Sequence, residues 1–199
     1  RAGRAAVADR SDGRSYRMAL SVLGVGAVLL LVGFALPWAT AQVPLATGVD
    51  TATRAQDFTG RDLFPAAAAS GWVCLAGLAG ILATRSWGRI AVGLIVAVAG
   101  LAGAAVAVAF AAVPATYVDS AAREMLGAES PLVSSATGWW ALCLLGGLLS
   151  VYAGAWTVLR GRRWPTLGSR YERTPRAAAA VSPWDALDKG EDPTADLVE

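Results

Sequence analysis

The sequence predicts an all-α protein: a four-helix transmembrane bundle with both termini in the cytoplasm and a flexible C-terminal tail. Three observations predict this fold. Charged residues make up only 16% of the 199 residues, whereas soluble domains carry about a quarter. Four apolar stretches are long enough to cross a bilayer, because a hydrocarbon core of about 30 Å takes about 20 helical residues. The arginines gather at both chain ends and in one tight turn.

The first predicted span covers residues 18–37 and follows a basic cytoplasmic segment, residues 1–17, that contains five arginines. Its apolar run, MALSVLGVGAVLLLVGFALP, is longer than the ~7–15 apolar residues of a secretory signal peptide. We therefore expect a retained helix. The alternative is cleavage near the word ATA at residues 39–41, which resembles a processing site.

Three further apolar stretches follow, at residues 64–84, 90–113 and 138–159. None of the four spans contains Asp, Glu, Lys or Arg, and each ends at or beside a proline or an arginine. A helix that is apolar on every face is either a membrane span or wholly buried in a large core. Four such helices in one short chain favour the membrane, so the predicted membrane domain covers residues 18–159.

The distribution of arginines predicts the orientation of the spans, because loops rich in basic residues stay in the cytoplasm. Both chain ends and the turn RSWGR are basic, whereas the two longer loops, residues 38–63 and 114–137, hold three arginines against six acidic residues. We therefore expect both termini inside and both longer loops outside. Five tryptophans near the span ends are expected to mark the membrane interface: Trp38, Trp87, Trp139, Trp140 and Trp164.

Small residues spaced four apart predict how the helices pack, because helices in lipid associate by close approach of their backbones. Three spans carry such stripes: Ala76/Gly80/Thr84, Ala99/Gly103/Ala107 and Gly146/Ser150/Gly154. We expect these stripes to form contacts within one bundle or in a homo-oligomer. The alternative is that a chain rich in Ala and Gly tolerates small residues without using them.

The residues needed for catalysis are scarce. Histidine is absent, which removes the commonest acid–base group and metal ligand. The two cysteines, Cys74 and Cys143, lie apart in apolar runs. The spans lack the ionisable side chains that proton-coupled transport uses, and the chain has no phosphate loop or nucleophile elbow. The sequence therefore predicts a protein that is not an enzyme, with no cofactor, no metal and no nucleic-acid partner.

The outer loops contain the one candidate for a polar site. Arg61 and Asp62 lie in the word TGRDLFP before the second span, while Arg123 and Glu124 lie in a short helix expected at residues 120–126. Ser120 would cap that helix. These four side chains, together with Asp57, are candidates for an ion-paired vestibule, and a solvated lid over the bundle is the alternative.

Residues 160–199 are expected to form a basic tether followed by an acidic tail. In SPWDALDKGEDPT, Ser182 and Asp185 match a helix-capping pattern, and Trp184 and Leu187 would share one face of the helix. So short a helix is unstable alone. We therefore expect a cytoplasmic protein partner to bind Trp184, Asp185, Leu187 and Asp188. The alternatives are that the tail binds the protein's own basic juxtamembrane segment, or that it is an unbound solubilising tail.

One residue and three short motifs resemble those of a known family. They are Trp38 after the first span, TGRDLFP, ATRSWGR and the closing WDALDKGEDPT. In these features the chain resembles the actinobacterial tryptophan-biosynthesis-associated membrane proteins, over residues 18–194. The resemblance implies a four-span protein of the bacterial inner (cell) membrane, encoded beside tryptophan-pathway genes. It supplies no catalytic residues.

Two functions fit these observations. The first is a membrane adaptor linked to tryptophan metabolism, which docks a cytoplasmic partner through its tail. The second is a permease, or permease subunit, for a small solute such as an aromatic amino acid, which would act as an oligomer. The spans lack the charges and the mid-span helix breaks that mark many transporter sites, so the adaptor is the first expectation.

Overall fold

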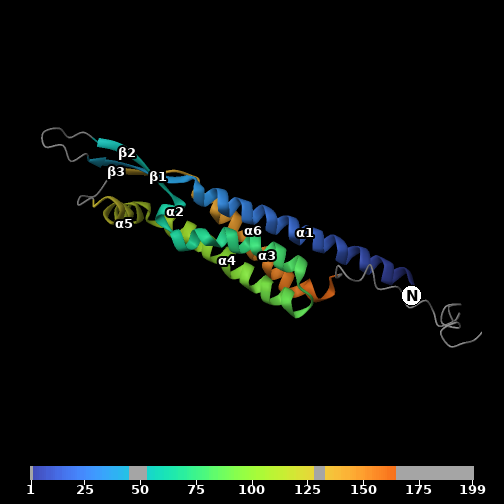
Figure 1. The fold of residues 1–199 in the computed structure, drawn as a ribbon. Helices are drawn as coiled ribbons and strands as arrows, with labels where there is room; N and C mark the ends of the chain where they lie inside the picture. Colours follow the sequence, from blue (N-terminus) through green and yellow to red (C-terminus); the bar gives the residue numbers. More distant parts are fainter. Residues whose placement is uncertain (1, 45–52, 128–132, 165–199) are drawn as a thin grey trace, which may run out of the picture. The chain divides into compact units, whose positions relative to one another are not determined.

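Four long helices form the body of the protein (Figure 1). They are α1 (Ala2–Ala35), α3 (Pro65–Ala83), α4 (Trp87–Ala112) and α6 (Trp140–Arg160). The computed structural model describes residues 2–44, 53–127 and 133–164. Each helix contains a segment that is long and apolar enough to cross a membrane, and α1 contributes Gly13–Ala35. The prediction of a mainly helical protein with four candidate spans is confirmed.

The spans begin and end within a few residues of the predicted positions. The largest difference is in α1, which continues without a break from the basic N-terminal segment into the first span. α3 and α5 (Pro114–Leu126) each begin with a proline. Proline suits a first helical position, because the amide hydrogen it lacks has no partner there in any case.

Helix α6 is the central element of the bundle. It packs against α1 on one face and against α4 on another, while α3 packs against the same two helices. Large apolar side chains cover the outside of these helices, among them Val28, Leu94, Val98, Leu101 and Leu148, all more than half exposed. Such a surface is suited to contact with lipid, because lipid chains are as apolar as these side chains.

The longer loops contain strands that the sequence analysis did not predict. They form a three-stranded antiparallel sheet in the order β2-β1-β3, with β1 at Pro37–Pro44, β2 at Thr53–Thr59 and β3 at Val133–Ala136. Ala39 and Ala41 of β1 are buried, whereas Gln42 is exposed. This alternation is the signal of a half-buried strand. It is weak here because the buried residues are alanines.

Helix α5 packs against β1 and β3, and it is longer than the helix expected at residues 120–126. It ends at Gly127, which has a left-handed φ of +64° and closes the helix as glycine commonly does. The prediction that Ser120 caps the helix is wrong. Ser120 lies in the middle of α5, where its hydroxyl donates a hydrogen bond to the carbonyl oxygen of Thr116 (2.8 Å).

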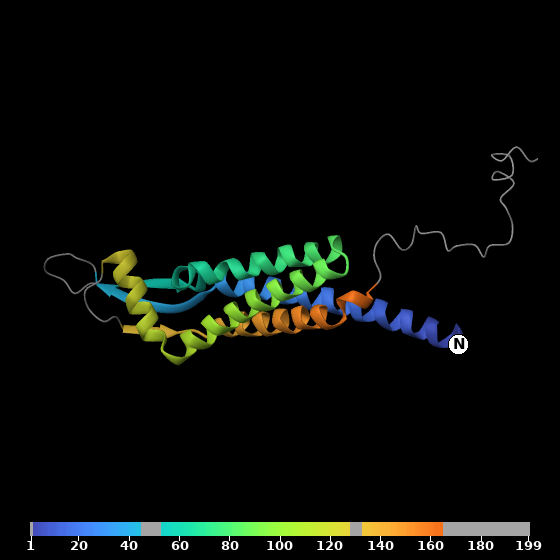
Figure 2. The same ribbon diagram turned by 90° about the horizontal axis from the view of Figure 1, so that it is seen from below.

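The two ends of the bundle differ in construction. The sheet, α5 and the one-turn helix α2 (Gly60–Leu63) lie at one end, which we call the sheet end (Figures 1 and 2). At the other end the start of the first span meets the end of α6, since the indole nitrogen of Trp164 donates a hydrogen bond to Ser15 Oγ (3.1 Å). We call this second end the Arg89 end, after the arginine buried there.

Candidate functional site

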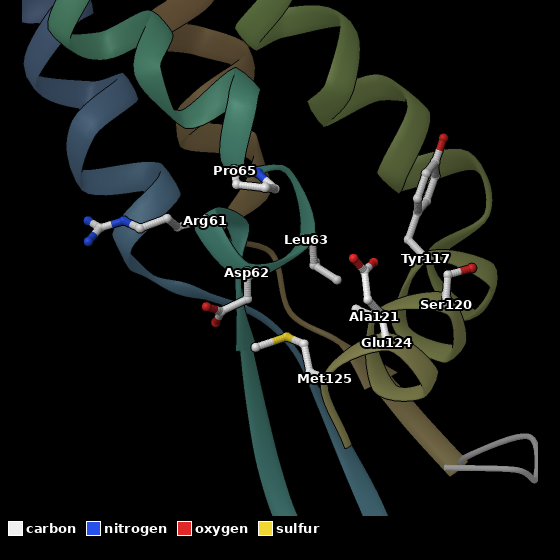
Figure 3. A pocket seen from close by; sticks show the side chains of 9 residues that line it. All are labelled: Arg61, Asp62, Leu63, Pro65, Tyr117, Ser120, Ala121, Glu124 and Met125. Atoms are coloured by element: carbon white, nitrogen blue, oxygen red, sulfur yellow. The ribbon is translucent and has the colours of Figure 1, made fainter. Parts of the chain in front are cut away.

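A pocket of about 410 Å³ lies at the sheet end, between α2, the start of α3 and one face of α5 (Figure 3). The residues that line it are Arg61, Asp62, Leu63, Pro65, Tyr117, Ser120, Ala121, Glu124 and Met125. Three of the five charged residues predicted for a vestibule, Arg61, Asp62 and Glu124, therefore line this pocket. Arg123 is not among the lining residues.

The acidic group of Asp62 is used to hold the local backbone. Its carboxylate accepts hydrogen bonds from the amide of Thr59 (2.9 Å) and from the hydroxyl of Thr59 (2.6 Å), and that hydroxyl accepts one from the amide of Asp62 (3.3 Å). This reciprocal arrangement is a capping box. It fixes the start of α2 through one carboxylate oxygen of Asp62, Oδ2.

The charged side chains at the pocket do not form the expected ion pairs. The side chains of Arg61 and Asp62 extend away from α5, whereas Glu124 rises from α5 itself (Figure 3). Among the described residues no ion pair joins Arg61, Asp62, Arg123 and Glu124, and Asp57 accepts a hydrogen bond from Thr40 Oγ1 instead (2.8 Å). The lining of the pocket therefore combines apolar side chains with charged residues of both signs.

Below this pocket, an aromatic cluster closes the sheet end of the bundle around Trp38. The Trp38 side chain is wholly buried, and its indole nitrogen donates a hydrogen bond to the carbonyl oxygen of Gly33 (2.8 Å). Its ring lies 5.1–5.8 Å from those of Phe34, Phe64 and Phe110. Tyr117 contacts Phe64 in turn (4.9 Å), which connects the cluster to the pocket.

A β-bulge accounts for the position of Trp38. In the β1–β2 ladder, Pro37 pairs with Thr59 and Ala39 pairs with Phe58, so Trp38 is the extra residue. A bulge redirects the side chain at that point. The prediction that Trp38 marks the membrane interface is wrong, because a residue buried in this way reaches neither lipid nor headgroup. Trp139 is 48% exposed and Trp87 is 73% exposed.

In the middle of the bundle, glycines of α6 bring helix backbones into contact. A methyl group at Gly146 would lie 2.8 Å from the carbonyl oxygen of Gly26 in α1, and one at Gly154 would lie 2.6 Å from that of Gly93 in α4. Between them, Ser150 is wholly buried and its hydroxyl donates a hydrogen bond to Gly146 O (2.9 Å). Gly146, Ser150 and Gly154 therefore lie at contacts inside one bundle.

Some residues of the other two predicted stripes face neighbouring helices, and one is exposed. A methyl group at Gly103 would lie 2.7 Å from Leu30, and one at Gly80 would lie 3.2 Å from Val92, so both glycines face neighbouring helices. Ala76 is exposed. Gly77 also faces α4, since a side chain there would collide with Val96. The contact face of α3 therefore includes Gly77 and Gly80 but not Ala76.

The sequence analysis did not predict the role of Arg89. In the sequence it is one of two arginines in the basic turn RSWGR, and nothing there indicates that its side chain is buried. It is 1% exposed. Its Nε donates to the carbonyl oxygen of Thr84 (3.1 Å), and Nη1 donates to those of Gly161 (3.3 Å) and Trp164 (3.0 Å). Its guanidinium carbon lies 5.5 Å from the centre of the Tyr16 ring.

These contacts explain how a charge can be buried at this end. A buried cation needs hydrogen-bond acceptors, and the last carbonyl groups of a helix carry partial negative charge. Arg89 thereby joins the α3–α4 turn to the end of α6. Trp164 completes the closure: it is 3% exposed and meets Tyr16 edge-on at 5.2 Å. The prediction that Trp164 marks the interface is also wrong.

The tail residues Trp184, Asp185, Leu187 and Asp188 lie outside the described residues. Docking of a cytoplasmic partner through them therefore stays a prediction.

A comparison with known families gives one match. The family described as tryptophan-associated transmembrane protein matches residues 20–194 of the chain. The match begins within the first span and extends into the tail that contains Trp184. No curated protein matches the sequence.

Proposed function

The chain belongs to the tryptophan-associated transmembrane protein family, and from this premise we propose that it is a non-enzymatic membrane adaptor linked to tryptophan metabolism. It is an integral membrane protein with four candidate spans. In this proposal the bundle anchors the protein, and residues 184–199 recruit a cytoplasmic partner.

The observation that carries the proposal is the closure of the Arg89 end. Arg89 binds the carbonyl oxygen of Trp164, the last described residue, and Trp164 is itself held by Ser15. The point from which residues 165–199 continue is therefore fixed to three helices of the bundle. A fixed exit point suits a protein whose bundle serves to anchor a partner-binding tail.

The contacts of α6 support an anchor more than a transport path. Gly147 and Gly154 meet the carbonyl oxygens of Gly100 and Gly93 so closely that a methyl group at either would lie 2.6 Å away. Backbones at this separation leave no space for a solute between α4 and α6. A single copy of the bundle therefore has no solute-sized path along this seam.

We infer that the Arg89 end faces the cytoplasm, which places both termini inside. Exposed arginines gather there: Arg14, Arg17, Arg85, Arg160 and Arg162. The sheet end carries acidic side chains beside its arginines. This asymmetry supports the inside placement of the basic end. Protease added to sealed inside-out vesicles should remove the tail, and protection of the tail there would overturn the orientation.

The residues of the tail suggest what kind of binding surface its partner has. Trp184 and Leu187 would form an apolar pair on one face of a short helix, with Asp185 and Asp188 beside them. A complementary partner presents an apolar groove with a basic rim. Aromatic residues such as Trp184 commonly dominate the binding energy of such contacts.

Crosslinking mass spectrometry in native membranes tests the adaptor directly. We expect a cytoplasmic protein to crosslink to Lys189, and we expect its copurification to be lost on deletion of residues 184–199. The double substitution Trp184→Ala with Leu187→Ala should have the same effect. The matched control Ala195→Ser with Val198→Ala should retain the partner. Copurification that is unchanged in the deletion would exclude the adaptor role.

The pocket at the sheet end favours one second candidate, a small-solute permease or permease subunit. Its mixture of apolar side chains with Arg61 and Glu124 is compatible with an amino acid that carries both charges. Purified protein in liposomes should then transport tryptophan, and the variant Glu124→Gln should change the rate. Flux equal to that of empty liposomes would reject this candidate without affecting the adaptor.

A further inference from the structure

The surface of the Arg89 end combines exposed arginines with exposed aromatic and aliphatic side chains. Arg162 lies with its guanidinium carbon 4.0 Å from the centre of the Trp87 ring, and Arg160 lies 4.5 Å from that of Trp156. Trp87 is 73% exposed and Leu159 is 76% exposed. Each of these two arginines therefore lies over the ring of a tryptophan at this end of the bundle.

We propose that Arg85, Trp87, Arg160 and Arg162 form a binding site for the phosphate group of an anionic phospholipid. The site takes one element from the α3–α4 turn and the other from the end of α6. It lies beside Arg89 but does not use it, because the guanidinium of Arg89 is buried among backbone carbonyl oxygens.

The pairing with tryptophan prepares the arginines for an anion. A guanidinium held over an aromatic face keeps its N–H donors directed outward in its own plane, and that planar set matches the oxygens of a phosphate. Among the described residues no carboxylate forms an ion pair with Arg85, Arg160 or Arg162. Their charge is therefore available to a ligand.

The position of the site favours a lipid over other anions. Tryptophan side chains collect at the level of the headgroups, and Trp87 lies where the α4 span begins. The exposed Leu159 is adjacent to Arg160 and within the α6 span. A phosphate bound by the arginines would thus have acyl chains beside an apolar helix surface, which soluble phosphates lack.

Lipid titration of the detergent-purified full chain, followed by native mass spectrometry and by thermal unfolding, tests the proposal. The probes are phosphatidylglycerol, which is anionic, and phosphatidylcholine, which has no net charge. We expect phosphatidylglycerol to stay bound and to raise the unfolding temperature, and phosphatidylcholine to do neither. Equal effects of the two lipids would overturn the proposal.

Substitutions locate the effect on the surface. Arg162→Ala should weaken phosphatidylglycerol binding about fivefold, and Arg85→Ala with Arg162→Ala should weaken it about 25-fold, because each basic residue near an anionic surface contributes a similar increment. Trp87→Leu retains the charge and should also weaken binding. Arg54→Ala, on the exposed strand β2 at the other end, is the matched control. Equal loss in the control variant would contradict a local site.

Two further experiments distinguish binding of a lipid from binding of inorganic phosphate or of the protein's own acidic tail. Inorganic phosphate at the same concentration should not raise the unfolding temperature, and a rise equal to that caused by the lipid would contradict a lipid site. The acidic tail is the other competitor. If phosphatidylglycerol binds only after deletion of residues 184–199, the tail occupies these arginines in the intact chain and the proposal is wrong. Equal binding with and without the tail supports it.

Discussion

The two ends of the bundle are closed by opposite means. At the sheet end the closing group is Trp38, an apolar ring surrounded by Phe34, Phe64 and Phe110. At the Arg89 end the closing group is a cation bound to backbone carbonyl oxygens. Both residues are almost completely buried. An apolar closure depends on filled volume, whereas an ionic closure depends on acceptors in the correct positions.

The difference has a consequence for function. The aromatic closure lies at the end of the bundle where the sheet, α2 and α5 are found (Figures 1 and 2). The Arg89 closure holds the last turn of the chain before residue 165. The first arrangement closes the bundle next to the sheet and α5, while the second fixes the chain just before residue 165. Variants at the two ends should therefore have separable effects.

The largest expected effect is at the sheet end. Trp38→Ala should lower the free energy of unfolding by about 3–5 kcal/mol, because it leaves a large cavity among three phenylalanine rings. Denaturant unfolding in detergent micelles measures this loss. Trp72→Ala, at a position that is 65% exposed, is the control and should change little. A loss at Trp38 no greater than at Trp72 would show that the ring is not packed as described.

At the opposite end, Arg89→Met should cost about 1.5–3 kcal/mol, the range for hydrogen bonds to a charged group. The methionine fills similar volume but leaves the carbonyl oxygens of Gly161 and Trp164 without their donor. Hydrogen exchange should increase at residues 157–164 and stay unchanged in β1. Arg17→Met, at an exposed position of the same end, is the control. Increased exchange at both ends would contradict two independent closures.

Between the two ends, Gly154→Leu should lower stability by about 1–3 kcal/mol, because an added side chain must displace the backbone of α4. Gly24→Leu is a matched control on α1, where an added carbon would meet nothing within 4 Å. Thermal unfolding of the two variants gives the comparison. Equal stability of the two variants would show that close contact between α4 and α6 at Gly154 does not stabilise the fold.

The smallest expected effect concerns the cap of α2. Asp62→Ala removes one half of the capping box and should cost about 1 kcal/mol. The loss should be confined to the sheet end, with faster hydrogen exchange at residues 59–64. Glu124→Ala removes a charge from the same pocket but leaves the Thr59–Asp62 capping box intact, so it should leave this exchange unchanged. A similar increase in both variants would indicate that net charge, not the cap, is responsible.

The spans were predictable because each depends on local composition alone. A run without charge that is long enough to cross the bilayer is recognised with no knowledge of its neighbours. The glycines of α6 were also visible in the sequence, since their spacing of four places them on related faces of one helix. What the sequence could not supply was the partner of each face, so the predicted stripe of α3 included Gly80 correctly but contained the exposed Ala76 and omitted the buried Gly77.

The sheet and the pocket were harder to predict because they depend on residues far apart in the chain. β1 pairs with β3, so that Ala41 lies opposite Ser134. The buried face of β1 consists of alanines, which have weak strand propensity. The capping box between Thr59 and Asp62 is local, and its pattern could have been recognised in TGRDL.

The sequence by itself determined that this chain is a membrane protein with four candidate spans and a strongly uneven distribution of arginine, because hydropathy and charge are properties of consecutive residues. Only the tertiary structure decided the environments of Trp38 and Arg89. Near a span end, a tryptophan or an arginine is equally suited to the interface, and these two are buried because non-local neighbours supply rings to one and carbonyl oxygens to the other.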